Sequence, residues 1–165
     1  MAVGGSKRRA DGGSRQPGGK GVGSHEPPAV PNGKLAFTFF SSSLHAYHDV
    51  QKQILDAARD LGIDGENFFA LRIALEEALI NAMKHGNRMD PKKKVHVETH
   101  LTARRAEITV EDEGPGFDRA SVPDPTDEAN LHKCSGRGIL LIEAYMHEVT
   151  WDRSGRRLRM IRESK

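Results

Sequence analysis

The chain has 165 residues, of which 36% are hydrophobic and 29% are charged, and its formal net charge at pH 7 is +2. This length favours one domain, and the small net charge does not indicate a protein that binds polyanions over its whole surface. The single cysteine, Cys134, excludes an intramolecular disulfide framework and a zinc site built from several cysteines. No apolar run approaches the roughly 20 residues of a membrane-spanning helix, and the start lacks the apolar region of a secretory signal. We therefore expect a cytoplasmic protein that does not use a membrane.

Residues 1–33 differ in composition from the rest of the chain. They hold nine of the 17 glycines and four of the eight prolines, and their net charge is +3. Such a segment cannot bury enough apolar surface to offset its ordering entropy, so we expect a disordered tail before a single domain over residues 34–165. The basic run at 7–9 suits a polyanion, but a solvated tail is the commoner role of such segments. We do not expect nucleic-acid binding.

The first half of the domain is predicted to contain a strand followed by two helices. The strand covers 35–40, which is rich in aromatic residues. Serines at 41–43 offer caps for a helix that continues to about Leu61, where Gly62 stops it. Asp64 is placed to cap a second helix that runs to about Lys84.

The second half of the domain is predicted to be mostly strands. Residues 95–101 and 106–112 alternate in polarity and are expected to pair as antiparallel neighbours. A loop over 118–135 precedes a helix over 138–146. Strands at 148–152 and 157–161 flank the turn at Ser154-Gly155. The order β-α-α-β-β-loop-α-β-β predicts an α+β two-layer sandwich, with a mixed, mostly antiparallel sheet and helices on one face.

The second helix carries the most information, because two of its faces look occupied. Helical spacing gathers an apolar stripe that predicts the core face: Phe68, Leu71, Leu75, Ala78, Leu79 and Ala82. The opposite side of the helix is formed by six residues, of which half are small or apolar: Ala70, Ile73, Ala74, Glu77, Asn81 and Lys84. Glu77 and Asn81 share that side one turn apart. They either point toward a group that covers this side of the helix, or they lie on a side of the helix that packs against another subunit.

One glycine-containing segment follows a predicted strand, and a second one precedes a predicted helix. Asp112 stands where a strand ends, and Gly114 and Gly116 after it permit close approach of a ligand to the backbone. A carboxylate there can accept a hydrogen bond from an exocyclic amine. Gly136-Arg137-Gly138 precedes a helix, whose free N–H groups form an anion site. Tight turns explain either segment alone, and neither one is a Walker A loop or a Rossmann fingerprint.

Taken in order, the motifs resemble those of a known superfamily. E-x-x-x-N at 77–81, D-x-G-x-G at 112–116 and G-R-G at 136–138 are similar to the N, G1 and G2 boxes of the Bergerat-fold (GHKL) ATPases, which include gyrase and histidine kinases. The resemblance covers about residues 35–161. The strings ALEEALINAMKHGN and SGRGILLI most resemble the bacterial anti-sigma-factor serine/threonine-protein kinases.

The resemblance implies ATP and Mg²⁺ as cofactors and a role for each matching residue. Asn81 would hold Mg²⁺, Glu77 would be the general base, and Asp112 would take the adenine amine. Gly114 and Gly116 would let the base lie against the backbone. The phosphate group would be held by Gly136, Arg137 and Gly138, under a lid formed by 118–135.

Three further positions near these boxes stay open. Lys84 and His85 adjoin the N box and are additional candidates for phosphate contact, although capping the helix end is an equal alternative for His85. The family often has a Gly-Thr step before its last strand, where this chain has Gly155-Arg156. That departure leaves the adenine contact on this side undecided.

The resemblance also implies a function and partners. The protein is expected to phosphorylate a serine of a STAS-domain anti-anti-sigma protein, to hold a sigma factor in a partner switch, and to form a homodimer. The alternative is a non-catalytic module that binds ATP or ADP only to regulate a protein partner.

Some conspicuous residues are expected to play structural or surface roles. The histidines His45 and His48 are expected on the surface rather than on a metal, and Trp151 is expected in the core. A basic cluster is expected to face water, with an acidic partner as the alternative: Arg153, Arg156, Arg157, Arg159 and Arg162.

Overall fold

The computed structural model describes residues 33–116, 137–152 and 154–164. Nearly all of the predicted tail, the predicted lid and Gly136 therefore lie outside the described residues. The described elements follow the predicted order and are β1 (Lys34–Phe40), α1 (Leu44–Asp60), α2 (Gly65–Ile80), η2 (Asn81–Gly86), β2 (Lys94–Thr102), β3 (Arg105–Asp112), α3 (Arg137–Tyr145), β4 (Glu148–Trp151) and β5 (Arg157–Glu163). No helix in these ranges is long and apolar enough to span a membrane.

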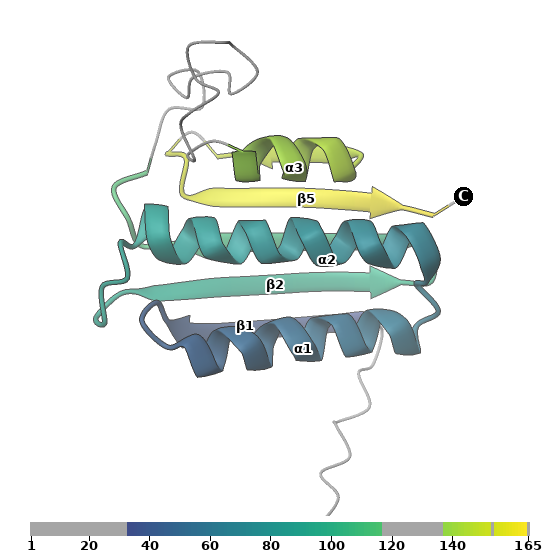
Figure 1. Cartoon of the computed structure of the whole chain (residues 1–165), viewed down its shortest axis with the longest axis horizontal. Helices are drawn as coiled ribbons and strands as arrows, with labels where there is room; N and C mark the ends of the chain where they lie inside the picture. Colours follow the sequence, from purple (N-terminus) through teal and green to yellow (C-terminus); the bar gives the residue numbers. More distant parts are fainter. Residues whose placement is uncertain (1–32, 117–136, 153, 165) are drawn as a thin grey trace, which may run out of the picture.

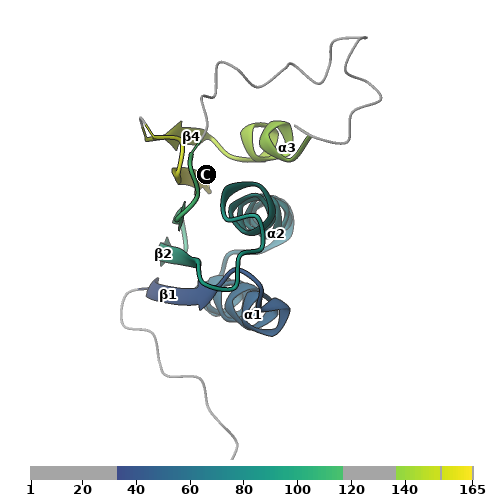
Figure 2. The ribbon, with the colours of Figure 1, turned by 90° about the vertical axis from the view of Figure 1, so that its left-hand side faces the viewer.

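The five strands form one sheet in the order β1-β2-β3-β5-β4 (Figure 1). Every described pairing is antiparallel, so the described sheet contains none of the parallel pairs that a mixed sheet would have. The predicted neighbours pair as expected, with Val95 opposite Asp112 and Leu101 opposite Ala106. The three α-helices lie together on one face of the sheet (Figure 2). The predicted α+β two-layer sandwich is confirmed.

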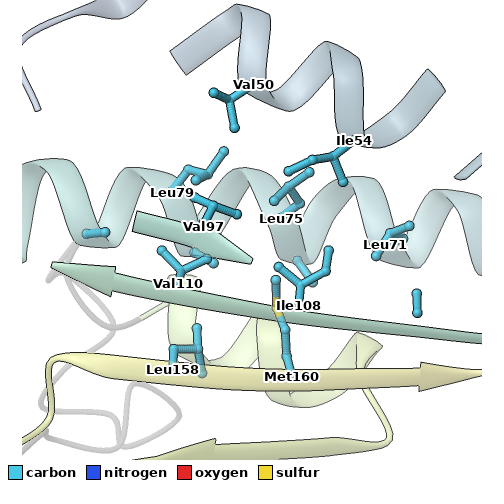
Figure 3. Packing of buried hydrophobic residues seen from close by; sticks show 14 of the residues in the cluster. Val50, Ile54, Leu71, Leu75, Leu79, Val97, Ile108, Val110, Leu158 and Met160 are labelled. Atoms are coloured by element: carbon cyan, nitrogen blue, oxygen red, sulfur yellow. The ribbon is translucent and has the colours of Figure 1, made fainter. Parts of the chain in front are cut away.

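The core lies between the helices and the sheet because both layers present apolar side chains there. Alternate residues of β2 and β3 are buried. Figure 3 shows side chains of α1 and α2 meeting those of the strands. The largest ones are fully buried, among them Ile54, Leu75, Leu79, Ile108 and Met160. Phe68, which the helical stripe placed in the core, is only partly buried against it.

The helix starts and ends follow from local chemistry with one exception. The Ala46 N–H donates to Ser43 Oγ (3.2 Å), which caps α1. Gly62, with φ of 86°, ends the helix as predicted. Asp64 stands at the start of α2 but its side chain makes no capping hydrogen bond, so that part of the prediction was wrong.

The far side of α2 is covered by α3, which packs against it (Figure 2). Ala70 and Ala74 on that side are buried. The rings of Phe69 and Tyr145 meet edge to face with centroids 5.7 Å apart. The small residues opposite the core stripe therefore accommodate a second helix of the same chain, as the first of the two sequence alternatives required.

Beyond Ile80 the helix widens into the π-helical segment η2. Its signature is the Asn87 N–H, which donates to the Ala82 carbonyl oxygen five residues earlier (2.8 Å). π-Helical turns are uncommon and occur frequently at functional sites. Immediately after it, Arg88 and Met89 both adopt positive φ, 55° and 57°.

The face of the sheet opposite the helices carries a ladder of ion pairs. Arg105 bridges Glu163 (2.6 Å) and Glu107 (3.2 Å), and Arg159 Nε donates to Glu107 Oε1 (2.7 Å). The Arg159 hydrogen bond holds the pKa of the Glu107 carboxyl below its ordinary value. Arg157 lies between Glu98 and Glu111 at 3.5 and 3.8 Å.

Candidate functional site

A cavity of about 220 Å³ opens between α2, η2 and the start of α3 on one side and the ends of the last three strands on the other. Its wall is mostly apolar and is formed by Ala78, Ala82, Val110, Ile139, Trp151 and Leu158. Its polar side chains are Asn81, His85, Asp112 and Arg156. An apolar pocket with a few convergent polar groups is typical of a small-molecule site.

Asp112 is held at the end of β3 by the backbone around it. Its N–H donates to the Arg156 carbonyl oxygen (3.1 Å), and its Oδ1 accepts from the Gly114 N–H (2.7 Å). Among the described residues, no donor bonds its Oδ2. Burial raises the pKa of the Asp112 carboxyl, while the Gly114 hydrogen bond and the charges of Arg156 and Lys93 act in the opposite direction. The side chain thus offers one oxygen to a ligand in the cavity.

Glycines surround Asp112 because the backbones approach too closely for side chains. A Cβ on Gly86 would collide with the Asp112 carboxylate, and a Cβ on Gly114 would collide with the Gly86 carbonyl oxygen. Gly116 has φ of 77°, and a Cβ there would collide with the Ser154 carbonyl oxygen. Gly114 and Gly116 were predicted for this site. Gly86, two residues past the predicted end of the second helix, was not predicted for the site, although it lies against the Asp112 carboxylate.

The other end of the cavity is formed where α2 meets α3. A Cβ on Gly138 would lie 2.5 Å from Glu77 Oε2 and 3.3 Å from Asn81 Oδ1, so the two predicted polar residues converge on the first turn of α3. The Asn81 Nδ2 is buried and has no hydrogen-bond partner among the described residues. Leaving a buried amide unpaired costs about 1–3 kcal/mol. Burial raises the pKa of the Tyr47 hydroxyl on α1, and the charges of Glu76 and Glu77 raise it further.

The remaining predicted positions are distributed unevenly. Arg137 begins α3 and is exposed. His85 lines the cavity, whereas Lys84 is exposed on η2 and is not among the residues of the cavity wall. Gly136 lies outside the described residues. Of the predicted residues, the cavity wall therefore contains Asn81, His85, Asp112, Gly116 and Gly138. Glu77 lies beside Gly138 and Gly114 beside Asp112, whereas Lys84 and Arg137 are not among the wall residues.

Asn87 lies beside this site and is a second residue, after Gly86, that sequence reasoning missed. It is fully buried, donates from Nδ2 to Ser41 Oγ (2.6 Å) and to the Lys94 carbonyl oxygen (2.7 Å), and accepts at Oδ1 from the Glu113 N–H (2.8 Å). The available signal was its place directly after Gly86, at the end of the N-box string.

Two further expectations need correction. Trp151 is only half buried and lines the cavity, because β4 is short and ends beside it. Of the basic cluster, Arg156 is exposed as expected and also lines the cavity, whereas Arg162 turns inward, donating to Asn67 Oδ1 and the Tyr145 carbonyl oxygen, both 2.9 Å. Arg153 lies outside the described residues.

The histidines of α1 lie on the surface, as expected. His45 contacts Asp49 at 3.2 Å, and both side chains are exposed. Within residues 33–116, 137–152 and 154–164, no three His, Cys, Asp or Glu side chains gather into a metal site.

Comparison with known proteins gives one family and a consistent set of relatives. The family model described as the histidine kinase-like ATPase domain matches residues 40–162. The chain is similar to an anti-sigma F factor of Oceanobacillus iheyensis, with 35% identity over 82 residues, which is 48% of this chain and 56% of the relative. It is also similar to the serine-protein kinase RsbW of Listeria innocua, with 31% identity over 94 residues, 53% of this chain and 60% of the relative. The match thus spans little more than half the length of these relatives.

Proposed function

Because the chain belongs to the histidine kinase-like ATPase family, we propose that its cavity binds ATP with Mg²⁺ and that it transfers the terminal phosphoryl group to a serine of a protein partner. The observation that carries the proposal is the convergence of Glu77 and Asn81 on Gly138, a residue of the same cavity wall as Asp112. A nucleotide needs one site for its purine base and a second site for its phosphate chain.

Base recognition rests on Asp112. Its Oδ2 can accept a hydrogen bond from the amine of adenine. The apolar wall that includes Val110, Leu158 and Trp151 suits the purine ring. A guanine would present a carbonyl there, which a carboxylate repels. A buried polar mismatch of this kind can reject an analogue by about 10⁴-fold.

The phosphates would lie at the start of α3. The free N–H groups of a helix N-terminus favour anions, and Gly138 leaves room beside them because it has no side chain. Arg137 adds a positive charge at the same turn. Phosphoryl transfer depends chiefly on such positioning and charge neutralisation.

The residues present also fit a magnesium ion. Among the described residues the buried Asn81 Nδ2 has no partner, so the side chain is not fixed by a bond from this atom. Its Oδ1, 3.3 Å from where a Cβ on Gly138 would stand, is an amide carbonyl oxygen and therefore a suitable Mg²⁺ ligand. Mg²⁺ commonly takes only one or two protein ligands and completes its shell with phosphate oxygens and water, and it neutralises phosphate charge. Glu77, one turn away, would accept the proton of the attacking serine.

The names of the similar proteins support a regulatory setting. Relatives named anti-sigma F factor and serine-protein kinase lead us to propose a partner switch, in which a STAS-domain anti-anti-sigma protein is the substrate and a sigma factor is the second partner. A homodimer, a cytoplasmic location and a domain over residues 34–165 belong to the same proposal.

A second function is favoured by one observation. Arg156 lines the cavity where the family often has a threonine, so this position offers the base no threonine hydroxyl. A module that binds nucleotide without transferring phosphate would tolerate such a change.

One experiment separates the two functions. The protein is incubated with Mg²⁺, ATP labelled in its γ-phosphate, and a STAS-domain protein that co-purifies with it, and ATP, ADP and GTP affinities are measured by calorimetry. Label on the STAS protein supports the kinase. ATP and ADP binding with no transfer to any co-purifying partner makes the binding module the better description, and equal GTP affinity contradicts the role of Asp112.

A further inference from the structure

We propose that Asn87 is a positioning residue for base recognition: it links η2 to the loop after β3 and thereby holds the Asp112 carboxylate in place. This inference rests on the proposed ATP site. Asn87 is not among the residues that line the cavity, although its N–H donates to the Ala82 carbonyl oxygen, so it acts through its neighbours and is not itself a catalytic residue.

The first step is the set of contacts that Asn87 makes. Its Nδ2 donates to Ser41 after β1 and to the Lys94 carbonyl oxygen at the start of β2, and its Oδ1 accepts from the Glu113 N–H after β3. One fully buried side chain thus connects three segments that are far apart in the sequence. Buried amides with all partners in place fix backbone geometry strongly, since the unpaired alternative is costly.

The second step is what holds Asp112. The N–H groups of three successive residues are fixed: that of Asp112 by the Arg156 carbonyl, that of Glu113 by Asn87, and that of Gly114 by the Asp112 side chain. Of these bonds, only the one to Asn87 uses a side chain from outside the loop. Without it, the peptide that follows Asp112 loses its partner, and the direction of the carboxylate loses a constraint.

The third step is the π-helical segment. Its widened turn places two adjacent residues against the same loop: Gly86 packs on the Asp112 carboxylate, and Asn87 bonds the next N–H. Directly afterwards Arg88 and Met89 adopt positive φ. Such backbone is disfavoured for residues other than glycine and persists where the surroundings over-determine it, commonly at functional sites. An unusual backbone on both sides of Asn87 is therefore consistent with a demanding placement of its amide.

The test measures how much Asp112 contributes to base recognition in three proteins: wild type, Asn87→Ala and Ser41→Ala. The Ser41→Ala change removes one partner of Asn87 but keeps its bond to Glu113, so it controls for stability. Each protein is titrated by calorimetry with ATP and with purine riboside triphosphate, which lacks the 6-amino group, at a temperature where its melting curve shows it folded. The ratio of the two dissociation constants reports the Asp112–amine hydrogen bond.

A hydrogen bond to a charged group predicts a wild-type ratio of at least about tenfold. We expect Ser41→Ala to keep this ratio within about twofold and Asn87→Ala to lower it to about one, although both variants are less stable. Should Asn87→Ala not fold, Asn87→Ser takes its place, because a hydroxyl is too short to reach Glu113 and Lys94 together. An unchanged ratio in the Asn87 variant, or an equal loss in Ser41→Ala, overturns the inference while leaving the ATP site intact. Absence of ATP binding by the wild type overturns both.

Discussion

Substituting Gly138 by alanine should lower the rate of phosphate transfer without lowering the stability of the fold. The distances around Gly138 give the size of both effects. A Cβ at this position would lie 2.5 Å from Glu77 Oε2, whereas ordinary Cβ contacts begin at 3.4 Å. The distance between the new Cβ and Glu77 Oε2 must therefore increase by about 0.9 Å. Rotating the flexible end of the Glu77 side chain costs less energy than moving the helix. The same change replaces glycine by the best helix former in the first turn of α3.

We therefore expect Gly138→Ala to fold with an unfolding free energy within about 1 kcal/mol of wild type. Phosphate transfer should nevertheless fall by about 10²-fold, because displacing a catalytic group by about 1 Å costs this much. The measurements are thermal unfolding and transfer of labelled phosphate to a STAS protein. Ala144→Gly, at an exposed position of the same helix, is the matched control and should lower stability by up to about 1 kcal/mol while keeping activity. Transfer by Gly138→Ala at the wild-type rate would refute the reasoning.

Three further predictions concern the same cavity. Glu77→Gln should bind ATP but transfer phosphate at least about 10²-fold more slowly, while Glu76→Gln should match wild type; equal transfer rates in labelled-ATP assays would remove the base assignment. ATP affinity should fall with decreasing pH at values above those where an ordinary aspartate protonates, because the pKa of Asp112 is raised and its ionised form accepts the stronger hydrogen bond from the amine. The effect on folding stability has the opposite sign: because the folded-state pKa is raised, protonation of Asp112 stabilises the fold at low pH, and this contribution is lost as pH rises from 3.8 through the raised pKa. Calorimetric titration of Asp112→Asn should show no such pH dependence of ATP affinity; its persistence would implicate another group. Gly114→Ala should destabilise the fold by about 1–3 kcal/mol in denaturant unfolding, because its Cβ meets the backbone oxygen of Gly86, which cannot rotate away; a wild-type unfolding midpoint would contradict the close approach.

The fold was predictable where the sequence pattern has a single structural solution. Residues 95–101 and 106–112 alternate in polarity around a short connection, and they pair in the expected register. The two apolar sides of α2 predicted coverage on both, and α3 and the sheet supply it. The positions of Asp112 and Gly116 at the cavity followed from a strand that ends in a glycine turn.

The rest depended on features that have no local sequence signal. The π-helical turn departs from regular α-helical spacing, so the burial of Asn87 after it did not follow from that spacing. Trp151 has the polarity of a core residue, but the strand carrying it ends at the cavity. Arg162 looked like one more surface charge, yet tertiary packing gives its guanidinium a carbonyl and an amide to bond.

The register of β3 against β5, which carries the ion-pair ladder on the open face of the sheet, has a consequence for the cavity. Antiparallel pairing sets Arg105 opposite Glu163 and Glu111 opposite Arg157. A slip of two residues in one direction would set Glu107 opposite Glu163, which is unfavourable, but it would also set Glu111 opposite Arg159, so the ion pairs alone do not fix the register. The same slip would carry the Arg156 carbonyl about 7 Å away from the Asp112 N–H, at about 3.4 Å per residue. The pairing of β3 with β5, which these ion pairs accompany on the outer face of the sheet, therefore sets the alignment of the two walls of the cavity.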